Sequence, residues 1–481
     1  VELTGPIWPK GSAEGPTHKR AWDHTGDFRP DEEVVTERVY FAVTRDDIRS
    51  AWKVVVPVHG IGHTYDVIVD AQDGSLLWRA NRLCGTTQPI TMRVYTSGSP
   101  APGHPGTPTQ NGFQFPFVER QLVTITPEMM APYSPNGWIN DNESETLGNN
   151  VDAHADHDGN NSPDLPRPNG GPSRVFDFPL DVMASPQTYK DAAVVQMFYY
   201  CNMYHDQFYA MGFDEAAGNY QQINFTGQGV GNDRIQADVQ DRYLPPSGTP
   251  SSNNANFTTS GTDGSTGRCQ MYVFIGPEPD RDGTLDADIV YHELTHGTSI
   301  RLHGGLTGVQ PQSMGEGWGD FVAIASFAEP DDDFEGVFAT GGYATYQFSF
   351  FAPVGSWNFN YYSGIRRFPY SVDFSKNPQT YADIDPAQQS YPPDVPRNTS
   401  ISNTANEVHN AGEVWCNTLI ECRAALMRHH GFEGNQRMLQ LVVDGMKLSP
   451  GNPNMLVARD AILQADMVNY GGEDMAQLWH G

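Results

Sequence analysis

The length, composition and charge of this chain limit what it can be. Its 481 residues are enough for roughly two or three domains. Hydrophobic residues make up 38% of the chain, and no apolar run approaches the about 18 residues that a membrane-spanning helix needs. The formal net charge of −29 argues against nucleic acid and anionic membranes as partners, because like charges repel.

The first 82 residues predict two kinds of structure. Residues 1–36 are rich in Pro, Gly and charge, so we expect an extended leader there. From residue 37 the apolar positions alternate as in strands, in AWKVVVPV and TYDVIVDA, and a turn at Asp73-Gly74 precedes SLLWRA. This pattern predicts a small antiparallel sheet over residues 37–82.

The rest of the chain changes from strands to helices. Residues 83–112 are rich in Thr, Ser, Pro and Gly and predict a linker around the strand TMRVYT. Residues 113–283 mix short strands with one strong helix, and helical periodicity dominates residues 284–481. We therefore predict an α+β protein with a β-rich lobe, a helical lobe and a cleft between them.

Two acidic clusters within the β-rich part are candidate calcium sites. Their carboxylates alternate along DHDGNNSPD and PDRDGTLDAD, and hard oxygen ligands suit Ca²⁺. Neither cluster completes an EF-hand, because no Glu stands at the twelfth position, and solvated acidic turns are the alternative. The principal candidate ligands are Asp156, Asp158, Asp280 and Asp282.

The segment ADIVYHELTHGTSIRL contains an H-E-x-x-H pattern at His292, Glu293 and His296. On a helix, two histidines four residues apart lie on one face and can bind the same metal ion. The intervening Glu can then act as general base for the attacking water of a zinc hydrolase. Without further support, two packed or solvated histidines would explain the pattern as well.

That support comes from SMGEGWGDFVAIASFA, where Glu316 follows His296 by twenty residues. Catalytic zinc commonly has three protein ligands, and His₂Glu is one such set. Asp320, one helical turn later, can accept the second N–H of a ligand imidazole. Ordinary solvated carboxylates are the alternative, but the surrounding glycines and apolar residues favour burial, and a buried carboxylate needs a cation.

A third candidate, His409, precedes an amphipathic helix in NEVHNAGEVWCNTLIECRAALMRHH. A histidine at a helix start is usually only a polar residue near the cap. In a zinc peptidase, however, a positioned His can donate to the oxyanion of the tetrahedral intermediate.

Together these segments resemble the fungalysin family of secreted zinc metallopeptidases, relatives of the thermolysin-type enzymes. The resemblance covers roughly Ile90 to the C-terminus. Beyond the metal motifs it rests on LGNNVDAHAD, VVQMFYYCNMYHDQFYAMGFDEAAGNYQ, GNDRIQADVQD, NNANF, GIRRFPYS and VHNAGEVW.

The resemblance implies a thermolysin-like two-lobe fold, secretion, protein or peptide substrates, and a preference for a hydrophobic residue after the scissile bond. The roles it implies are zinc ligands His292, His296 and Glu316, base Glu293, transition-state residue His409, and substrate-backbone residues Asn254 and Ala255. Either Arg366 or Arg367 aligns with a carbonyl-binding arginine. One departure is that no Tyr occurs from Gly297 to Gly315, where thermolysin has a catalytic tyrosine.

The predicted sheet over residues 37–82 resembles the end of the propeptide of such enzymes. We therefore expect a partly processed precursor whose mature enzyme begins between about Leu83 and Pro105; a permanent β-module is the alternative. A further interpretation is a surface or assembly protein that retains the peptidase fold without catalysis. It is motivated by the retained propeptide-like sequence and the missing tyrosine.

Overall fold

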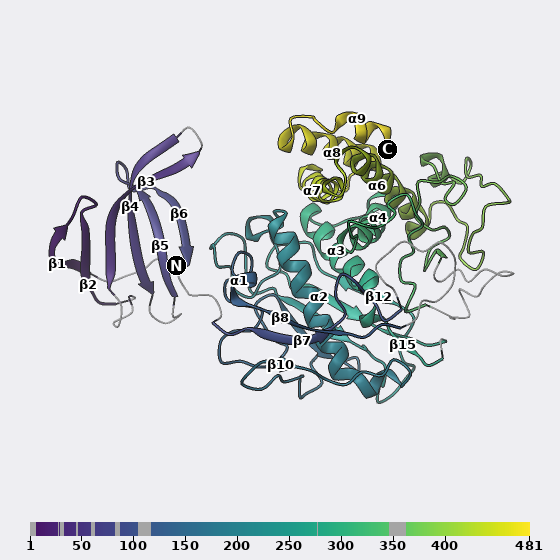
Figure 1. The fold of residues 1–481 in the computed structure, drawn as a ribbon, viewed down its shortest axis with the longest axis horizontal. Helices are drawn as coiled ribbons and strands as arrows, with labels where there is room; N and C mark the ends of the chain where they lie inside the picture. Colours follow the sequence, from purple (N-terminus) through teal and green to yellow (C-terminus); the bar gives the residue numbers. More distant parts are fainter. Residues whose placement is uncertain are drawn as a thin grey trace.

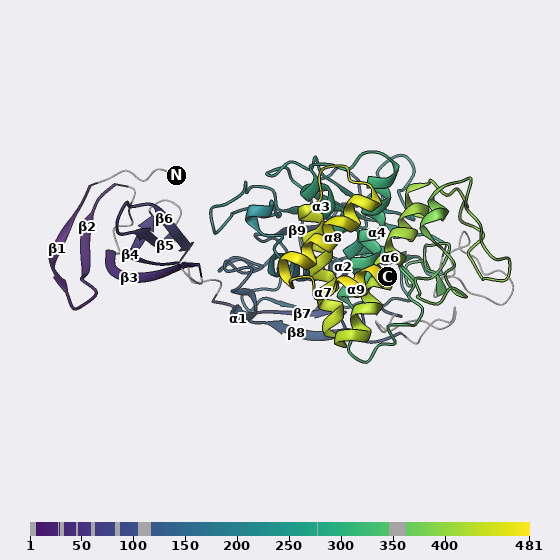
Figure 2. The same ribbon diagram turned by 90° about the horizontal axis from the view of Figure 1, so that it is seen from above.

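The chain folds into an N-terminal sheet and a larger mixed α/β body, which lie side by side (Figures 1 and 2). The computed structural model describes residues 6–26, 28, 33–44, 47–58, 63–81, 87–103, 117–276, 278–345 and 362–481. One apolar core runs through the larger body from Ile90 to Leu478. The two-part order that we predicted for this body, strands first and helices second, is confirmed.

The N-terminal sheet has six strands, each paired antiparallel with the next. They are β1 (Ile7–Glu14), β2 (Lys19–His24), β3 (Val34–Thr44), β4 (Asp47–Val58), β5 (His63–Asp70) and β6 (Leu76–Asn81). The prediction of an extended leader over residues 1–36 is wrong, because β1 and β2 belong to this sheet. Every residue of β1 is exposed, and backbone pairing with β2 holds the strand in place. Its sequence therefore shows no alternation of apolar and polar residues from which a strand could be predicted.

The larger body begins with a strand that we had placed inside a linker. β7 (Ile90–Val94) is the middle strand between β8 (Gln121–Ile125) and β10 (Val175–Phe176), and Ile90, Met92 and Val94 are fully buried. The strand predicted within residues 83–112 is confirmed, but as a core strand it contradicts the prediction that this stretch is only a linker. Its residues 83–86 and 104–112 lie outside the described part of the chain.

A second sheet supplies one wall for the candidate site. Its order is β12-β13-β11-β9, with β12 (Ala255–Thr258) antiparallel at one edge. The other strands, β13 (Arg268–Met271), β11 (Ile235–Val239) and β9 (Val151–Ala155), run parallel to one another. A short hairpin of β14 (Val273–Phe274) and β15 (Arg281–Asp282) follows.

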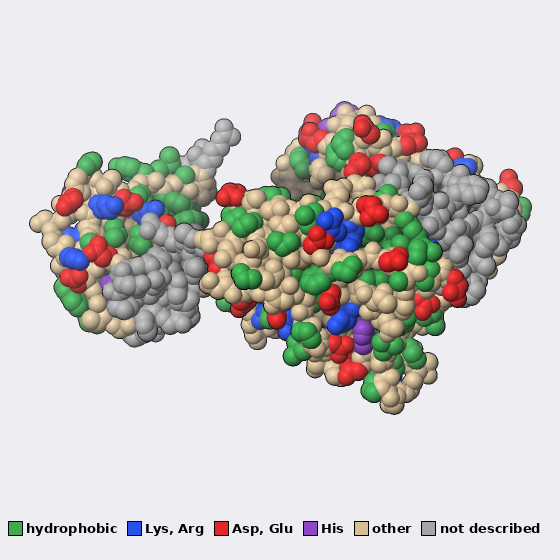
Figure 3. All heavy atoms as spheres, turned by 60° about the horizontal axis from the view of Figure 1, so that its bottom comes forward, with side chains coloured by type: hydrophobic (Ala, Val, Ile, Leu, Met, Phe, Trp, Pro, Cys, Tyr) green, Lys and Arg blue, Asp and Glu red, His purple; other side chains and the backbone are tan. Residues whose placement is uncertain are grey.

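Helices form the rest of the body, and most of them lie in the region 284–481 where helical periodicity was predicted to dominate. In chain order they are α1 (Pro127–Met130), α2 (Lys190–Ala210), α3 (Ala287–His303), α4 (Val309–Ser326), α6 (Val408–His430), α7 (Glu433–Leu448), α8 (Met455–Asn469) and α9 (Met475–His480). None of the helices in the described ranges is long and apolar enough to cross a membrane. On the face in Figure 3, Lys and Arg are scattered among Asp and Glu and do not gather into a patch.

Strand β9 carries a buried histidine that links protonation to stability. The two ring nitrogens of His154 lie 3.0 Å from Asp152 and 3.0 Å from Asp238, and all three side chains are nearly or fully buried. Burial opposes a charge on the ring, but the two carboxylates outweigh it and raise the pKa of His154 to about 9. Because this pKa exceeds the unfolded value near 6.5, the charged ring stabilises the fold fully only below about pH 6.5.

We predict that this stabilisation disappears as the pH rises from about 6.5 to 9. The free energy of unfolding should differ between the wild type and His154→Gln, and the difference should shrink by on the order of 2 kcal/mol over that interval. Urea unfolding of both proteins at several pH values measures the effect. A difference that stays constant or grows would contradict the charged state of His154.

Candidate active site

The three predicted metal ligands converge in the structure. His292 and His296 lie on one face of α3, with ring centroids 4.6 Å apart. Glu316 comes from α4, and its carboxylate oxygens lie 3.2 Å from Nε2 of His292 and 3.6 Å from Nε2 of His296. One ligand atom from each residue lies within 4.8 Å of the other two.

Glycines on α4 and α6 allow the helices around the ligands to approach closely. A Cβ atom at Gly319 would lie 2.6 Å from Nδ1 of His292, and one at Gly412 would lie 2.6 Å from Cβ of Glu316. Such distances are too short for any side chain, so these two positions require glycine. Glycine at both positions therefore lets the ligand-bearing helices pack against each other and against α6.

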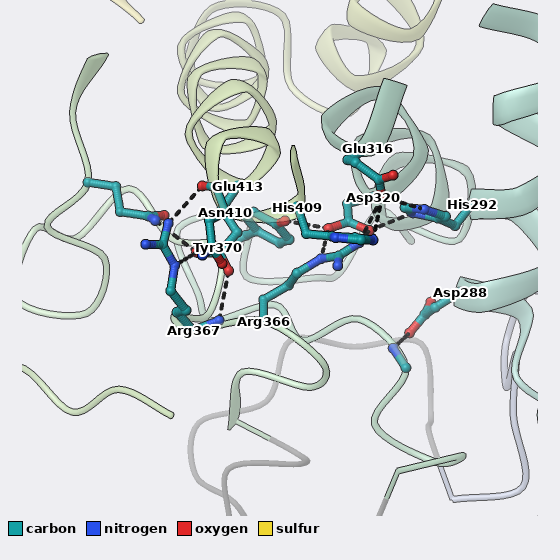
Figure 4. Close-up of polar contacts among 12 residues, drawn as sticks. Asp288, His292, Glu316, Asp320, Arg366, Arg367, Tyr370, His409, Asn410 and Glu413 are labelled. Atoms are coloured by element: carbon teal, nitrogen blue, oxygen red, sulfur yellow. Dashed lines mark hydrogen bonds and ion pairs between the residues drawn. The ribbon is translucent and has the colours of Figure 1, made fainter. Parts of the chain in front are cut away.

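Asp320 contacts the first predicted ligand, at the position expected for a residue that orients its ring. Nδ1 of His292 lies 2.7 Å from Oδ1 of Asp320. The guanidinium of Arg366 donates to both oxygens of the same carboxylate, at 2.6 and 2.9 Å, and the Tyr370 hydroxyl also donates to it. Figure 4 shows Asp320 between the His292 ring and Arg366. With its Nδ1 proton held by Asp320, His292 directs Nε2 toward Glu316.

Burial and charge shift the proton affinities of these groups in opposite directions. Burial raises the pKa of Glu293 to about 7, and the charge of Glu316 adds to the effect. Burial lowers the pKa of His296 to about 4, so its neutral imidazole offers a lone pair. Burial also disfavours charge on His292, but Asp320 and Glu316 outweigh it and raise that pKa to about 10. Despite its burial, Glu316 has a pKa well below the ordinary value because His296 and His292 lie beside it.

The donor set fits a metal ion. Within the described part of the chain, one buried oxygen of Glu316 and one of Glu293 have no hydrogen-bond partner. The 3.2 Å contact from His292 to Glu316 lacks hydrogen-bond geometry, so the two atoms face a common position without satisfying each other. Two imidazoles and a carboxylate with an open side form the set that catalytic zinc uses, and a cation would take the place of a proton on His292.

The ligands line a cleft of about 440 Å³ that β12 borders. Asn254 and Ala255, which we predicted to hold substrate backbone, both line it, and β12 is the edge strand of its sheet. An extended peptide can add to such an edge through main-chain hydrogen bonds. Much of the remaining lining is apolar: Phe274, Ile289, Ile300, Leu306, Ile365 and Val408.

His409 lies at the start of α6 and borders the same cleft. Nδ1 of its half-exposed ring lies 2.7 Å from Oε1 of Glu407, and Nε2 lies 3.5 Å from Oε2 of Glu316. The hydrogen bond with Glu407 is the main reason that the pKa of His409 is raised. Of the two arginines left open by the sequence, Arg366 lines the cleft, whereas Arg367 contacts Glu413 on α6.

The structure separates the two acidic clusters. Carboxylate oxygens of Asp156, Asp158 and Asp164 lie within 4.8 Å of one another, so calcium binding there remains a prediction. The second cluster does not form a site among the described residues. Asp282 accepts from Gln240 and from the backbone of η3 (Gly283–Leu285), and Asp280 accepts from a tyrosine. A calcium site at Asp280 and Asp282 therefore stays a prediction that no cluster of ligand side chains supports among the described residues.

Sequence reasoning missed two residues that hold the predicted ones. Tyr370 is in the quoted GIRRFPYS, but nothing local shows that its hydroxyl reaches Asp320. Glu407 could have been found, because a carboxylate two residues before His409 is well placed to cap α6 and to orient the ring.

Sequence comparison adds evidence independent of this geometry. Residues 112–481 match the family described as Fungalysin metallopeptidase (M36). Extracellular metalloproteinase mep of Aspergillus niger is 36% identical over 417 residues, which are 81% of this chain and 57% of the relative. Extracellular metalloproteinase MEP of Pyricularia oryzae is 37% identical over 387 residues, covering 74% of this chain and 54% of the relative. The chain thus spans about half the length of the curated relatives it matches.

A solved structure also aligns with the chain. It is the precursor of protealysin, a metalloproteinase from Serratia proteamaculans. The alignment covers 70% of this chain and 89% of that chain, with 15% sequence identity and a TM-score of 0.38.

We predict that Glu316→Ala abolishes stable metal binding, because only two protein ligands remain. Asp320→Asn keeps all three ligands but loses the charge that orients His292, so metal affinity should fall by about 10- to 100-fold. Zinc content after dialysis against a chelator buffer measures both effects, with Asp460→Ala on the exposed surface of α8 as the control outside the site. Stoichiometric metal in Glu316→Ala would contradict its role as ligand.

Proposed function

Because the chain belongs to the fungalysin metallopeptidase family, we propose that it is a secreted zinc endopeptidase. The observation that carries the proposal is the position of Glu293. Its buried carboxylate, with one oxygen unpartnered among the described residues, lines the same cleft as His292, His296 and Glu316. Burying a carboxylate without a partner destabilises the fold. Such groups with a shifted pKa are typical of catalytic sites.

The proposed metal is zinc, held by two imidazoles and one carboxylate. Bound zinc supplies Lewis-acid chemistry, which polarises the scissile carbonyl and makes a water molecule easier to deprotonate. The protein holds the ligands in place through Asp320, which keeps the His292 ring in one orientation. These residues also create the dry surroundings that strengthen charge interactions in the cleft.

Glu293 is the proposed general base. A carboxylate with a pKa near 7 can accept a proton from the attacking water and return it to the leaving amine at neutral pH. His409 donates from Nε2 to the developing oxyanion, while Glu407 holds the proton on Nδ1. Arg366 contributes positive charge near a substrate carbonyl from its fixed position on Asp320.

Substrate binding follows from the walls of the cleft. Asn254 and Ala255 hold an extended backbone at the β12 edge, and side chains next to Phe274, Ile289 and Ile365 meet an apolar surface. That lining supports a preference for a hydrophobic residue after the scissile bond. The names of the relatives, extracellular metalloproteinases, support secretion and protein substrates.

The decisive variant is Glu293→Gln, which keeps the shape of the side chain and removes the base. We predict full zinc stoichiometry and nearly complete loss of casein hydrolysis. The wild-type activity should disappear with chelator and return with added zinc. Loss of zinc from Glu293→Gln would show that Glu293 is a ligand. A folded, metal-replete wild type without turnover would instead favour the non-catalytic scaffold.

We further propose that the β1–β6 sheet is a propeptide. It has its own buried residues, Val34, Ala51, Val55 and Ile68, outside the core of the larger body. A hydrogen bond joins this sheet to the larger body: the Arg79 guanidinium donates to the carbonyl of Thr226 at 3.0 Å. A sheet that folds around its own small core can leave without unfolding the rest.

Cleavage should occur before Thr87, since its backbone and hydroxyl already bind Asp141, and β7 begins at Ile90. We predict that autolysis releases a fragment that ends between Asn81 and Thr87 and that this cleavage raises activity. Adding the released β1–β6 fragment back should inhibit the shortened enzyme. Sequencing the new N-terminus and assaying both forms measure this. A shortened chain that is inactive or insoluble even with the sheet supplied in trans would make the sheet a permanent domain.

A further inference from the structure

Two consecutive arginines between Gly364 and Ser371 are buried and extend to different helices. Arg366 binds Asp320 on α4, as described above. Arg367, fully buried, binds Glu413 on α6. Figure 4 shows the two side chains diverging from one backbone segment. The segment therefore connects the helix that carries Glu316 with the helix that carries His409.

The contacts of Arg367 hold the first turns of α6 at several points. Its backbone N–H donates to Oε1 of Glu413 at 2.8 Å, and its Nε donates to Oε2 at 3.1 Å. Its Nη2 donates to the carbonyl of Asn410 at 2.7 Å, one residue after His409. Gln379 completes the cluster by donating to Oε2 of Glu413 at 2.8 Å.

The opposite side of α6 is held just as closely. A Cβ atom at Gly412 would lie 2.6 Å from Cβ of Glu316 and 2.7 Å from the carbonyl of Ser313. The start of α6 thus lies between the Arg367 cluster and α4, and it cannot shift without breaking one of these contacts. The 3.5 Å separation of His409 Nε2 from Glu316 Oε2 depends on that placement.

A buried ion pair is weak evidence for stability, since apolar residues of similar volume are often as stable in its place. Its geometric effect is different, because hydrogen bonds to a backbone N–H, a backbone carbonyl and a carboxylate fix direction as well as distance. Errors of about 1 Å in the placement of a catalytic group can cost about 10²-fold in rate.

We propose that Arg367 and Glu413 are positioning residues, which place His409 and Arg366 relative to the metal ligands. The inference rests on the proposed peptidase function. Neither residue lines the cleft; both act by fixing where α6 starts and where residues 364–371 lie. Their removal should therefore lower kcat and leave metal binding and KM nearly unchanged, because the ligands and the β12 edge do not depend on them.

The test is the double variant Arg367→Met/Glu413→Leu, which removes both charges together and leaves no buried ion unpaired. The expected result is a folded protein with full zinc content, KM within about threefold of the wild type, and kcat lowered by about 10- to 100-fold. Calorimetric binding of a phosphonamidate peptide, a tetrahedral analogue, should weaken in parallel, because it depends on groups placed for the transition state. The single variant Arg367→Lys, which keeps the charge without the planar fork, should retain part of kcat.

The matched control is Arg423→Met, in the C-terminal half of α6 and away from the cleft. Arg423 is also fully buried, and its Nε donates to Oδ1 of Asn435 at 2.5 Å. This variant should lower the melting temperature without changing kcat. An equal loss of kcat in this control would show that any weakening of α6 reduces activity, which would overturn the positioning role.

Other outcomes are equally decisive. Unchanged kcat in the folded double variant, or loss of zinc from it, would overturn the proposal. If the double variant does not fold, Glu413→Gln replaces it, and the same split between kcat and KM is required. A wild type without zinc-dependent turnover would contradict the proposed function itself, which separates the two failures.

Discussion

The carboxylate of Asp320 is the interaction on which the candidate site depends. It is almost completely buried, and it accepts from His292, Arg366 and Tyr370. A buried charge without such partners would be strongly destabilising. Because these partners come from two distant parts of the chain, satisfying this one charge fixes both α3 and residues 364–371 against α4.

The close contacts of backbone are the second constraint. Gly319 and Gly412 bring the His292 ring and the start of α6 against α4 at distances that no side chain would allow. The same close packing brings His409 at the start of α6 to 3.5 Å from Glu316 on α4. The polar cluster of Arg367, Glu413 and Gln379 holds the outer side of the same arrangement.

The N-terminal sheet follows a different physical logic. Its strands pair in sequence order. Its few buried residues form a small core that is separate from the core of the larger body. By contrast, β7 lies only a few residues further along the chain and is central to the core of the larger body. The boundary between the N-terminal sheet and the larger body therefore falls between Asn81 and Ile90, at the start of the interval from Leu83 to Pro105 that the sequence indicated.

The sequence by itself determined the features that local spacing controls. Four-residue spacing placed His292 and His296 on one helical face, and helical periodicity assigned residues 284–481 to a mainly helical lobe. Only the tertiary structure decided which of Arg366 and Arg367 lines the cleft. It also showed that Asp156, Asp158 and Asp164 converge, whereas Asp282 accepts hydrogen bonds from Gln240 and from nearby backbone. It also revealed β1 and the roles of Tyr370 and Glu413. The reason is that these features depend on contacts between residues distant in sequence, or on backbone pairing that leaves no apolar pattern. Residue spacing records which side of an element a side chain lies on, but it does not record which distant element packs there.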